Sequence, residues 1–193
     1  MRAMRILPIL ILAVSLVGLP ACSSPGTPKG QFESLVRELS KSQGVQGTST
    51  KTRGKLEKRF AKVESWAMKG KLETAEDKLW ASACLVHAES GERIALALLL
   101  ARQAAQEGEP RALPLIAQAM DKEALQAGRP QPYGTQYLFH ANPGIWVLYD
   151  IDPRISDMER ESMGLPPLSE LYANVKILNQ QHQERVLESM TDR

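Results

Sequence analysis

The chain has 193 residues, with 24 Lys and Arg against 22 Asp and Glu and a formal net charge of +2. Because the charges nearly balance and acidic residues lie among the basic cluster at 51–73, the composition excludes the strongly basic surface of a nucleic-acid-binding protein. The length suits one domain that buries a core of its own.

The first 22 residues predict a bacterial lipoprotein signal. Arg2 and Arg5 form a short basic segment, and residues 6–17 are almost purely apolar. The segment Leu19-Pro20-Ala21-Cys22 follows, with small residues before a cysteine, and it resembles the lipobox of secreted bacterial lipoproteins. We therefore expect residues 1–21 to be removed and Cys22 to carry the lipid.

A membrane-spanning helix is the alternative interpretation of this segment. It needs about 20 consecutive apolar residues, whereas the run at 6–21 is shorter and is interrupted by Pro8, Gly18 and Pro20. Removal of the signal also removes Arg2 and Arg5, so the remaining chain is close to neutral.

Residues 22–54 are expected to form a flexible tether with one amphipathic helix. Residues 23–30 are rich in proline and glycine, which is typical of a linker. An amphipathic helix is predicted at 31–43, and the glycine-punctuated stretch 44–54 is predicted to be a loop.

The next part predicts a series of helices joined by short turns. We expect them at 55–69, at 74–89 with Thr74 as the N-cap, at 92–107 and from Pro110 to about 127. The helix at 92–107 is apolar nearly all round, so it should be the central and most buried one.

The pattern changes after Gly128. A β-hairpin is predicted near 133–151, a short helix capped by Ser156 at 156–163, and a last helix from Leu168 to about 190. The expected fold is therefore mainly α (α+β): a helical-hairpin bundle with one small β-hairpin and a C-terminal helix, forming a single domain over 55–193.

Motifs for established catalytic or metal sites are absent from the sequence. A three-histidine metal site would require His87, His140 and His182 to converge from separate segments, and we predict neither a metal nor a cofactor. With Cys22 lipidated, Cys84 has no intrachain partner, and its apolar helical surroundings predict a small buried hydrophobic side chain. A thiolate beside His87 is the weaker interpretation.

The densest polar segment is Gln131-Pro132-Tyr133-Gly134-Thr135-Gln136. In one interpretation it lines a ligand pocket, with Gly134 permitting close backbone approach. In the other it is a structural connection whose polar side chains satisfy backbone groups. The residues alone leave both open.

This segment also carries a family resemblance. After the expected hairpin comes Arg160-x-x-x-Gly164-Leu165-Pro166-Pro167-Leu168-x-x-Tyr172. Together, the two stretches resemble a bacterial domain family of unknown function with the signature Q-x-Y-G-T-Q … R-x-x-x-G-L-x-P-L-x-x-Y, over about residues 74–172. Members often carry Q-H-A and D-R upstream, where this chain has Val86-His87-Ala88 and Asp121-Lys122. The resemblance implies a shared polar cluster, which consists of His87, Asp121, Gln131, Tyr133, Thr135 and Gln136.

Two roles for this cluster are open. In a hydrolase or lyase, Asp121 would orient His87 as general base, and Gln136 or the Tyr133 hydroxyl would hold a substrate oxygen. In a structural role, His87 and Asp121 would form a buried pair that fixes the hairpin onto the helices.

The sequence as a whole favours a lipid-anchored protein of the bacterial cell envelope. Ser23, rather than aspartate, follows Cys22, which in a Gram-negative host is the usual pattern for the outer membrane, facing the periplasm. We expect a periplasmic binding or structural module, with the membrane and an envelope protein as partners. The alternative is a hydrolase or lyase that uses His87 and Asp121.

Overall fold

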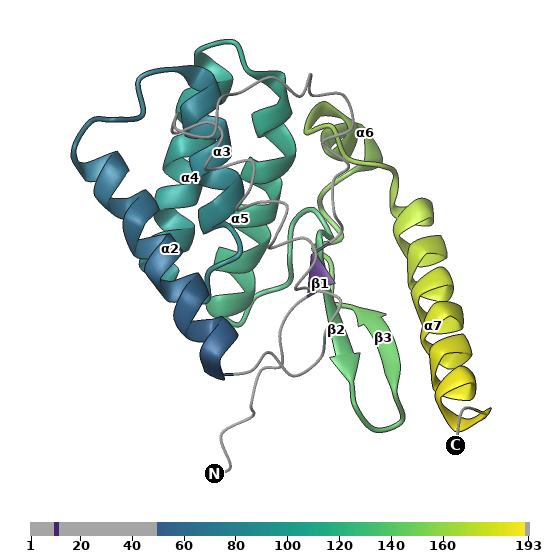
Figure 1. Cartoon of the computed structure of the whole chain (residues 1–193). Helices are drawn as coiled ribbons and strands as arrows, with labels where there is room; N and C mark the ends of the chain where they lie inside the picture. The colour runs from purple at the N-terminus through teal and green to yellow at the C-terminus, as the bar shows by residue number, and fades with distance from the viewer. Residues whose placement is uncertain (1–9, 12–49, 192–193) are drawn as a thin grey trace.

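A bundle of helices and a hairpin backed by a long helix make up the fold (Figure 1). The computed structural model describes residues 10–11 and 50–191. In chain order the elements are β1 (Leu10–Ile11), α2 (Thr50–Met68), α3 (Ala75–Leu85), α4 (Gly91–Gln106), the 3₁₀ turn η1 (Pro110–Ala112), α5 (Leu113–Gln126), β2 (Gln136–His140), β3 (Ile145–Leu148), α6 (Asp157–Ser162) and α7 (Leu168–Thr191). The mainly helical fold with a small hairpin and a C-terminal helix is confirmed.

Capping boxes begin two of the helices where the sequence predicts them. At α3, the Thr74 side chain accepts the N–H of Asp77 at 3.1 Å, and the Asp77 carboxylate accepts the N–H of Thr74 at 3.1 Å. At α6, Ser156 and Glu159 form the same reciprocal pair. Each box satisfies backbone donors that would otherwise lack a partner at the helix start.

Helix α2 begins earlier than predicted. It starts at Thr50, so residues 50–54 are helical and do not belong to the expected tether at 22–54. Arg93 of α4 explains part of this, because its guanidinium pairs with Glu57 at 2.6 Å and Glu64 at 3.0 Å and so holds α2 against the bundle. Tertiary contacts of this kind stabilise a helix beyond its intrinsic propensity. The rest of the tether, and Cys22, lie outside the described residues.

Helix α3 ends earlier than predicted, at Leu85 rather than near Glu89. The N–H groups of His87 and Ala88 bond to the carbonyls three residues back, at 3.3 and 2.9 Å, which tightens the chain into a turn. His87 is therefore in the turn between α3 and α4 and not in mid-helix.

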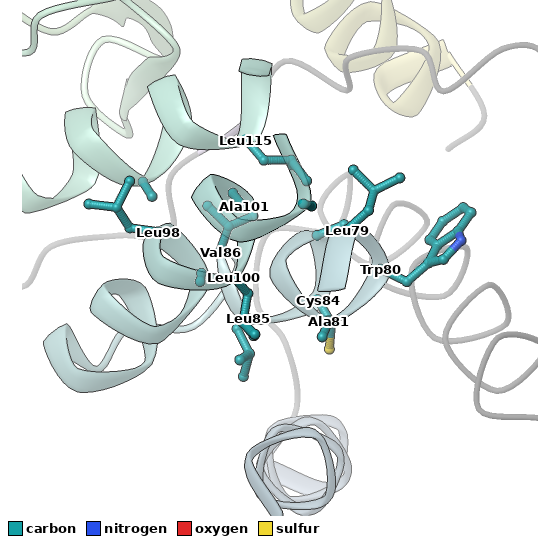
Figure 2. Close-up of a cluster of buried hydrophobic side chains, with 14 of the residues drawn as sticks. Leu79, Trp80, Ala81, Cys84, Leu85, Val86, Leu98, Leu100, Ala101 and Leu115 are labelled. Atoms are coloured by element: carbon teal, nitrogen blue, oxygen red, sulfur yellow. The ribbon is translucent and has the colours of Figure 1, made fainter. Parts of the chain in front are cut away.

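The core of the bundle lies where α3 and α5 pack against α4 (Figure 2). On α4, Ala97, Ala101 and Ala104 are fully buried, and their small side chains let the neighbouring helices approach closely. The prediction that α4 is the most buried helix is wrong. Leu99 on α4 is 52% exposed, whereas every residue of α3 from Leu79 to Leu85 is buried.

The hairpin formed by β2 and β3 lies within the range predicted for it. Its strands are antiparallel, with Tyr137 opposite Leu148 and Phe139 opposite Trp146. Leu10 and Ile11 of β1 pair with the other edge of β2, so the sheet order is β1-β2-β3. Strand β1 lies within the segment that the sequence predicts to be a signal.

Helix α7 runs alongside the hairpin (Figure 1) and contacts it through Asn179 and His182. The side-chain oxygen of Asn179 accepts the backbone N–H of Trp146 at 2.6 Å, and the side-chain amide nitrogen of Asn179 donates to the backbone carbonyl of Trp146 at 3.0 Å. Phe139 packs between Trp146 and His182, with ring centroids 4.9 and 4.8 Å apart. These contacts make a second, smaller hydrophobic cluster. Among the described helices, none combines the length and apolar character needed to cross a bilayer.

Candidate functional site

The Asp121 carboxylate connects helix α5 to the polar segment 131–136. Its Oδ1 accepts the backbone N–H of Tyr133 at 2.6 Å, and its Oδ2 accepts both the N–H and the hydroxyl of Thr135 at 2.7 Å. Asp121 is fully buried. Burial raises the pKa of this carboxyl to about 6, and the three hydrogen bonds work against that rise.

The buried side chain of Gln131 holds the same segment by hydrogen bonds to the backbone. Its amide donates to the carbonyls of Gln136 and Tyr149 at 3.0 Å each, and its side-chain oxygen accepts the N–H of Gln136 at 2.9 Å. Its own backbone bonds to residues 150 and 152 at 2.9 Å. Every polar group of Gln131 thus holds the chain on either side of the hairpin, which is the structural use of a buried glutamine.

Gln136 extends the network by one step. Its amide nitrogen donates to the Thr135 hydroxyl at 2.7 Å. Its side-chain oxygen is buried and has no hydrogen-bond partner among the described residues. The segment is therefore a continuous hydrogen-bonded unit that runs from Asp121 through Thr135 to Gln136, and Gln131 braces the Gln136 backbone.

His87 does not join this unit. Burial, and then the charge of Lys122, lower the pKa of His87 to about 3. Lys122 is itself buried, and its ammonium donates to the Ala88 carbonyl at 3.3 Å, on the turn that holds His87. Asp121 and Lys122 are consecutive on α5, so their side chains leave the helix in different directions. Asp121 accepts hydrogen bonds from the segment 131–136, and Lys122 donates one to the turn after α3.

The structure therefore unites five of the six predicted site residues, which are Asp121, Gln131, Tyr133, Thr135 and Gln136. Tyr133 takes part through its backbone, while its half-buried side chain lines a small cavity. The charge of Lys122 acts on His87, whereas the three hydrogen bonds given for Asp121 come from Tyr133 and Thr135.

The sequence does not single out Arg160 of α6, which lies beside this unit. Its side chain is 1% exposed and lies behind Gly134, where an added Cβ would be 3.1 Å from Arg160 Nη2. Arg160 stands in the second half of the family-like signature, and in the sequence it looks like one more charge on an acidic, solvated helix. Its position three residues after Asp157 and four before Gly164 carries no sign of burial.

Cys84 lies in the hydrophobic core of the bundle (Figure 2). It is fully buried as a free thiol, and burial raises its pKa to about 12. A thiol in this state is a poor nucleophile because the thiolate is the reactive form. Among residues 10–11 and 50–191, no group of three His, Cys, Asp or Glu side chains gathers as a metal site would require.

Comparison with known proteins does not extend these observations. No protein-family model, no curated protein and no solved structure matches this chain. The resemblance of residues 74–172 to a bacterial family of unknown function stays a prediction from the sequence.

Proposed function

We propose that this chain is a bacterial lipoprotein, anchored in the cell envelope by acylated Cys22, and that its folded part is a periplasmic binding or structural module. The proposal has two parts, the anchor and the role of the domain. They are supported by different observations and are tested separately.

The anchor is supported by the sequence at residues 1–22. A basic start, an apolar run too short to span a bilayer and a small-residue site before cysteine occur in the order that a lipoprotein signal requires. Ser23 after the cysteine favours delivery to the outer membrane in a Gram-negative host. The linker composition that follows suits a domain held away from lipid.

The role of the domain is supported chiefly by the hydrogen bonds that Asp121 accepts. Both of its oxygens accept hydrogen bonds from the segment 131–136. A general base or an orienting carboxylate must reach a reacting group or a histidine. Since Asp121 is committed to the loop and His87 lies near Lys122, this arrangement favours a binding or structural module over a hydrolase or lyase.

Fractionation of cells that make the full chain tests the anchor. The wild-type protein is expected in the membrane fraction and to incorporate labelled palmitate, whereas Cys22→Ser is expected to lose the label and leave the membrane. Cys84→Ala is the matched control, because it removes the other cysteine and should keep both properties. Unchanged membrane association and labelling of Cys22→Ser would overturn the anchor.

The membrane of residence is tested at the next position. Ser23→Asp should move the protein from the outer to the inner membrane fraction of a Gram-negative cell while labelling persists. The domain's role is tested by pull-down of the lipidated protein after crosslinking. A reproducible envelope partner supports a binding or structural module, whereas a chemical turnover that is lost in both Asp121→Asn and His87→Gln would overturn it.

A further inference from the structure

Helix α2 and the turn that ends it present a stripe of exposed lysines, which consists of Lys55, Lys58, Lys62 and Lys69. Their spacings of three, four and seven residues place them on one face of a helix. The Lys69 N–H bonds to the Ser65 carbonyl at 3.1 Å, so the helical course of the backbone continues to the last of them. We call these residues the lysine stripe.

The acidic residues of α2 do not neutralise the lysine stripe. In the sequence, Glu57 and Glu64 stand among the lysines, but in the fold both pair with Arg93 of α4, at 2.6 and 3.0 Å. Their charges are therefore balanced by the bundle. Among the described residues, no salt bridge involves Lys55 or Lys58, so this face of α2 keeps its positive charge.

An indole ring lies at the same face. The Lys62 ammonium is 4.8 Å from the centroid of the Trp66 ring, and Trp66 is half-buried against the core of the bundle. Tryptophan is enriched where proteins meet the headgroup layer of a bilayer, because its ring is apolar and its N–H is polar. Lysines beside it can pair with the phosphates of the same layer.

The distribution of charge over the domain gives it an orientation. Figure 1 shows α2 at the left of the molecule and α6 and α7 at the right. Helix α6 carries the exposed acids Asp157, Glu159 and Glu161. An anionic surface therefore attracts the side with α2 and repels the side with α6. Helix α2 is also the first described helix after Cys22, and it begins 28 positions further along the chain.

We propose that the lysine stripe docks the domain on a membrane surface of anionic phospholipid headgroups. The ammonium groups of the stripe lie against the lipid phosphates, and α6 points away from the bilayer. Each lysine near an anionic surface strengthens binding about fivefold. The inference rests on the proposed function, because the lipid anchor is what holds the domain beside a membrane, but the stripe can be tested without the anchor.

Vesicle sedimentation of the purified full chain carrying Cys22→Ser provides the test. This variant has no acyl group, so its binding reports on the stripe and not on the anchor. It should bind vesicles of equal parts phosphatidylglycerol and phosphatidylcholine more tightly than vesicles of phosphatidylcholine alone, and added salt should reduce the difference. Any affinity of the apolar segment 6–17 for lipid is common to both kinds of vesicle.

Two double variants in this background locate the surface. Lys55→Gln/Lys58→Gln removes two charges of the stripe and keeps a good helix former at both positions, and binding to the phosphatidylglycerol vesicles should fall about tenfold or more. Lys176→Gln/Arg185→Gln is the matched control, because it removes the same charge from exposed positions on α7. It should bind as the parent does. Equal melting temperatures would show that neither change disturbs the fold.

Three results would overturn the proposal. The first is equal binding to the two kinds of vesicle, and the second is an equal loss of binding in the two double variants. The third is capture of an acidic envelope protein that depends on Lys55 and Lys58 without any response to phosphatidylglycerol, which would make the stripe a protein-binding surface. Palmitate labelling of the wild type decides the anchor separately, so failure of the stripe and failure of the anchor are distinguishable.

Discussion

Asp121 and Thr135 are joined by two hydrogen bonds, because one carboxylate oxygen accepts both the backbone N–H and the hydroxyl of Thr135 at 2.7 Å. The two residues come from α5 and from the segment that leads into β2. Their contact therefore fastens the hairpin to the helical bundle. It also sets the position of Gly134, which lies between the two residues that Asp121 holds.

Asp121→Ala should destabilise the fold. The substitution leaves the N–H groups of Tyr133 and Thr135 and the Thr135 hydroxyl without their acceptor in a buried site. Each buried unsatisfied polar group costs about 1–3 kcal/mol, so the loss of the three bonds should lower the free energy of unfolding in urea by about 3 kcal/mol or more. Asp150→Ala, at an exposed neighbouring position, should change the free energy of unfolding little. Equal effects of the two substitutions would contradict the role given to Asp121.

The stability should depend on the protonation of Asp121. Its pKa is about 6 in the folded protein and lies near its ordinary value of 3.8 when unfolded. The folded state therefore holds this proton more tightly, and the stabilisation is complete below about pH 4 and is lost as the pH rises through about 6. The free energy of unfolding of the wild type, minus that of Asp121→Asn, should therefore fall as the pH rises over this range. The fall is worth about 1.4 kcal/mol for each tenfold difference in proton affinity between the folded and unfolded states. Effects of His87 are common to both proteins and cancel. A difference that rises with pH would contradict this assignment.

Gly134→Ala should cost much more than the same change at another glycine with positive φ. Gly134 has φ +73°, and a Cβ there would lie 2.7 Å from Leu171 Cδ1 and 2.9 Å from Ile151 Cδ1. Gly70 has φ +64° but no atom within 4 Å of the added Cβ. The backbone penalty is about 1–2 kcal/mol for both, and overpacking adds about 1–3 kcal/mol at Gly134 alone. Thermal unfolding of both variants checks this. Similar melting temperatures would contradict the prediction, because they would show that the segment 131–136 shifts enough to accommodate the added methyl group.

Asn179→Ala should loosen the hairpin from α7. Its side chain exchanges two hydrogen bonds with the backbone of Trp146, at 2.6 and 3.0 Å. Their loss should cost about 1–3 kcal/mol and speed hydrogen exchange at the Trp146 amide. Gln180→Ala, the exposed neighbour on the same helix, should leave that amide as protected as in the wild type. Unchanged exchange in Asn179→Ala would mean that the aromatic contacts alone hold the hairpin.

Cys84 should not react with thiol reagents in the folded protein. It is fully buried, and burial raises its pKa to about 12. In the Cys22→Ser background, where it is the remaining thiol, its labelling should become fast only when denaturant unfolds the chain. Fast labelling without denaturant would show that α3 opens locally.

Local chemistry was enough to predict several elements. Thr74 and Ser156 begin helices because each stands three residues before an acid that completes a capping box. The hairpin follows from two short aromatic and β-branched runs that flank a turn at 141–144. These predictions succeeded because the residues that decide them are neighbours in the sequence.

Other features required the packed structure. Long-range contacts accompany both the start of α2 at Thr50 and the turn after α3. Arg93 of α4 pairs with Glu57 and Glu64 of α2, and Lys122 of α5 donates to the Ala88 carbonyl in the turn after α3. The sequence placed Gln131, Tyr133, Thr135 and Gln136 together because they are adjacent, but both roles that it left open paired Asp121 with His87. Only the helix phase of α5 sends Asp121 to the loop and Lys122 to the turn at His87.

The sequence by itself determined the order of the helices, the hairpin and the polar segment, because these depend on short-range patterns of size, charge and backbone preference. The lipid anchor at Cys22 stays a prediction from the same kind of pattern. Only the tertiary structure decided that Asp121 holds the loop and that Arg160 is buried behind Gly134. The physical reason is that burial and hydrogen-bond partnership depend on which surfaces meet across the fold. In this chain, the residues concerned come from α5, the loop before β2 and α6.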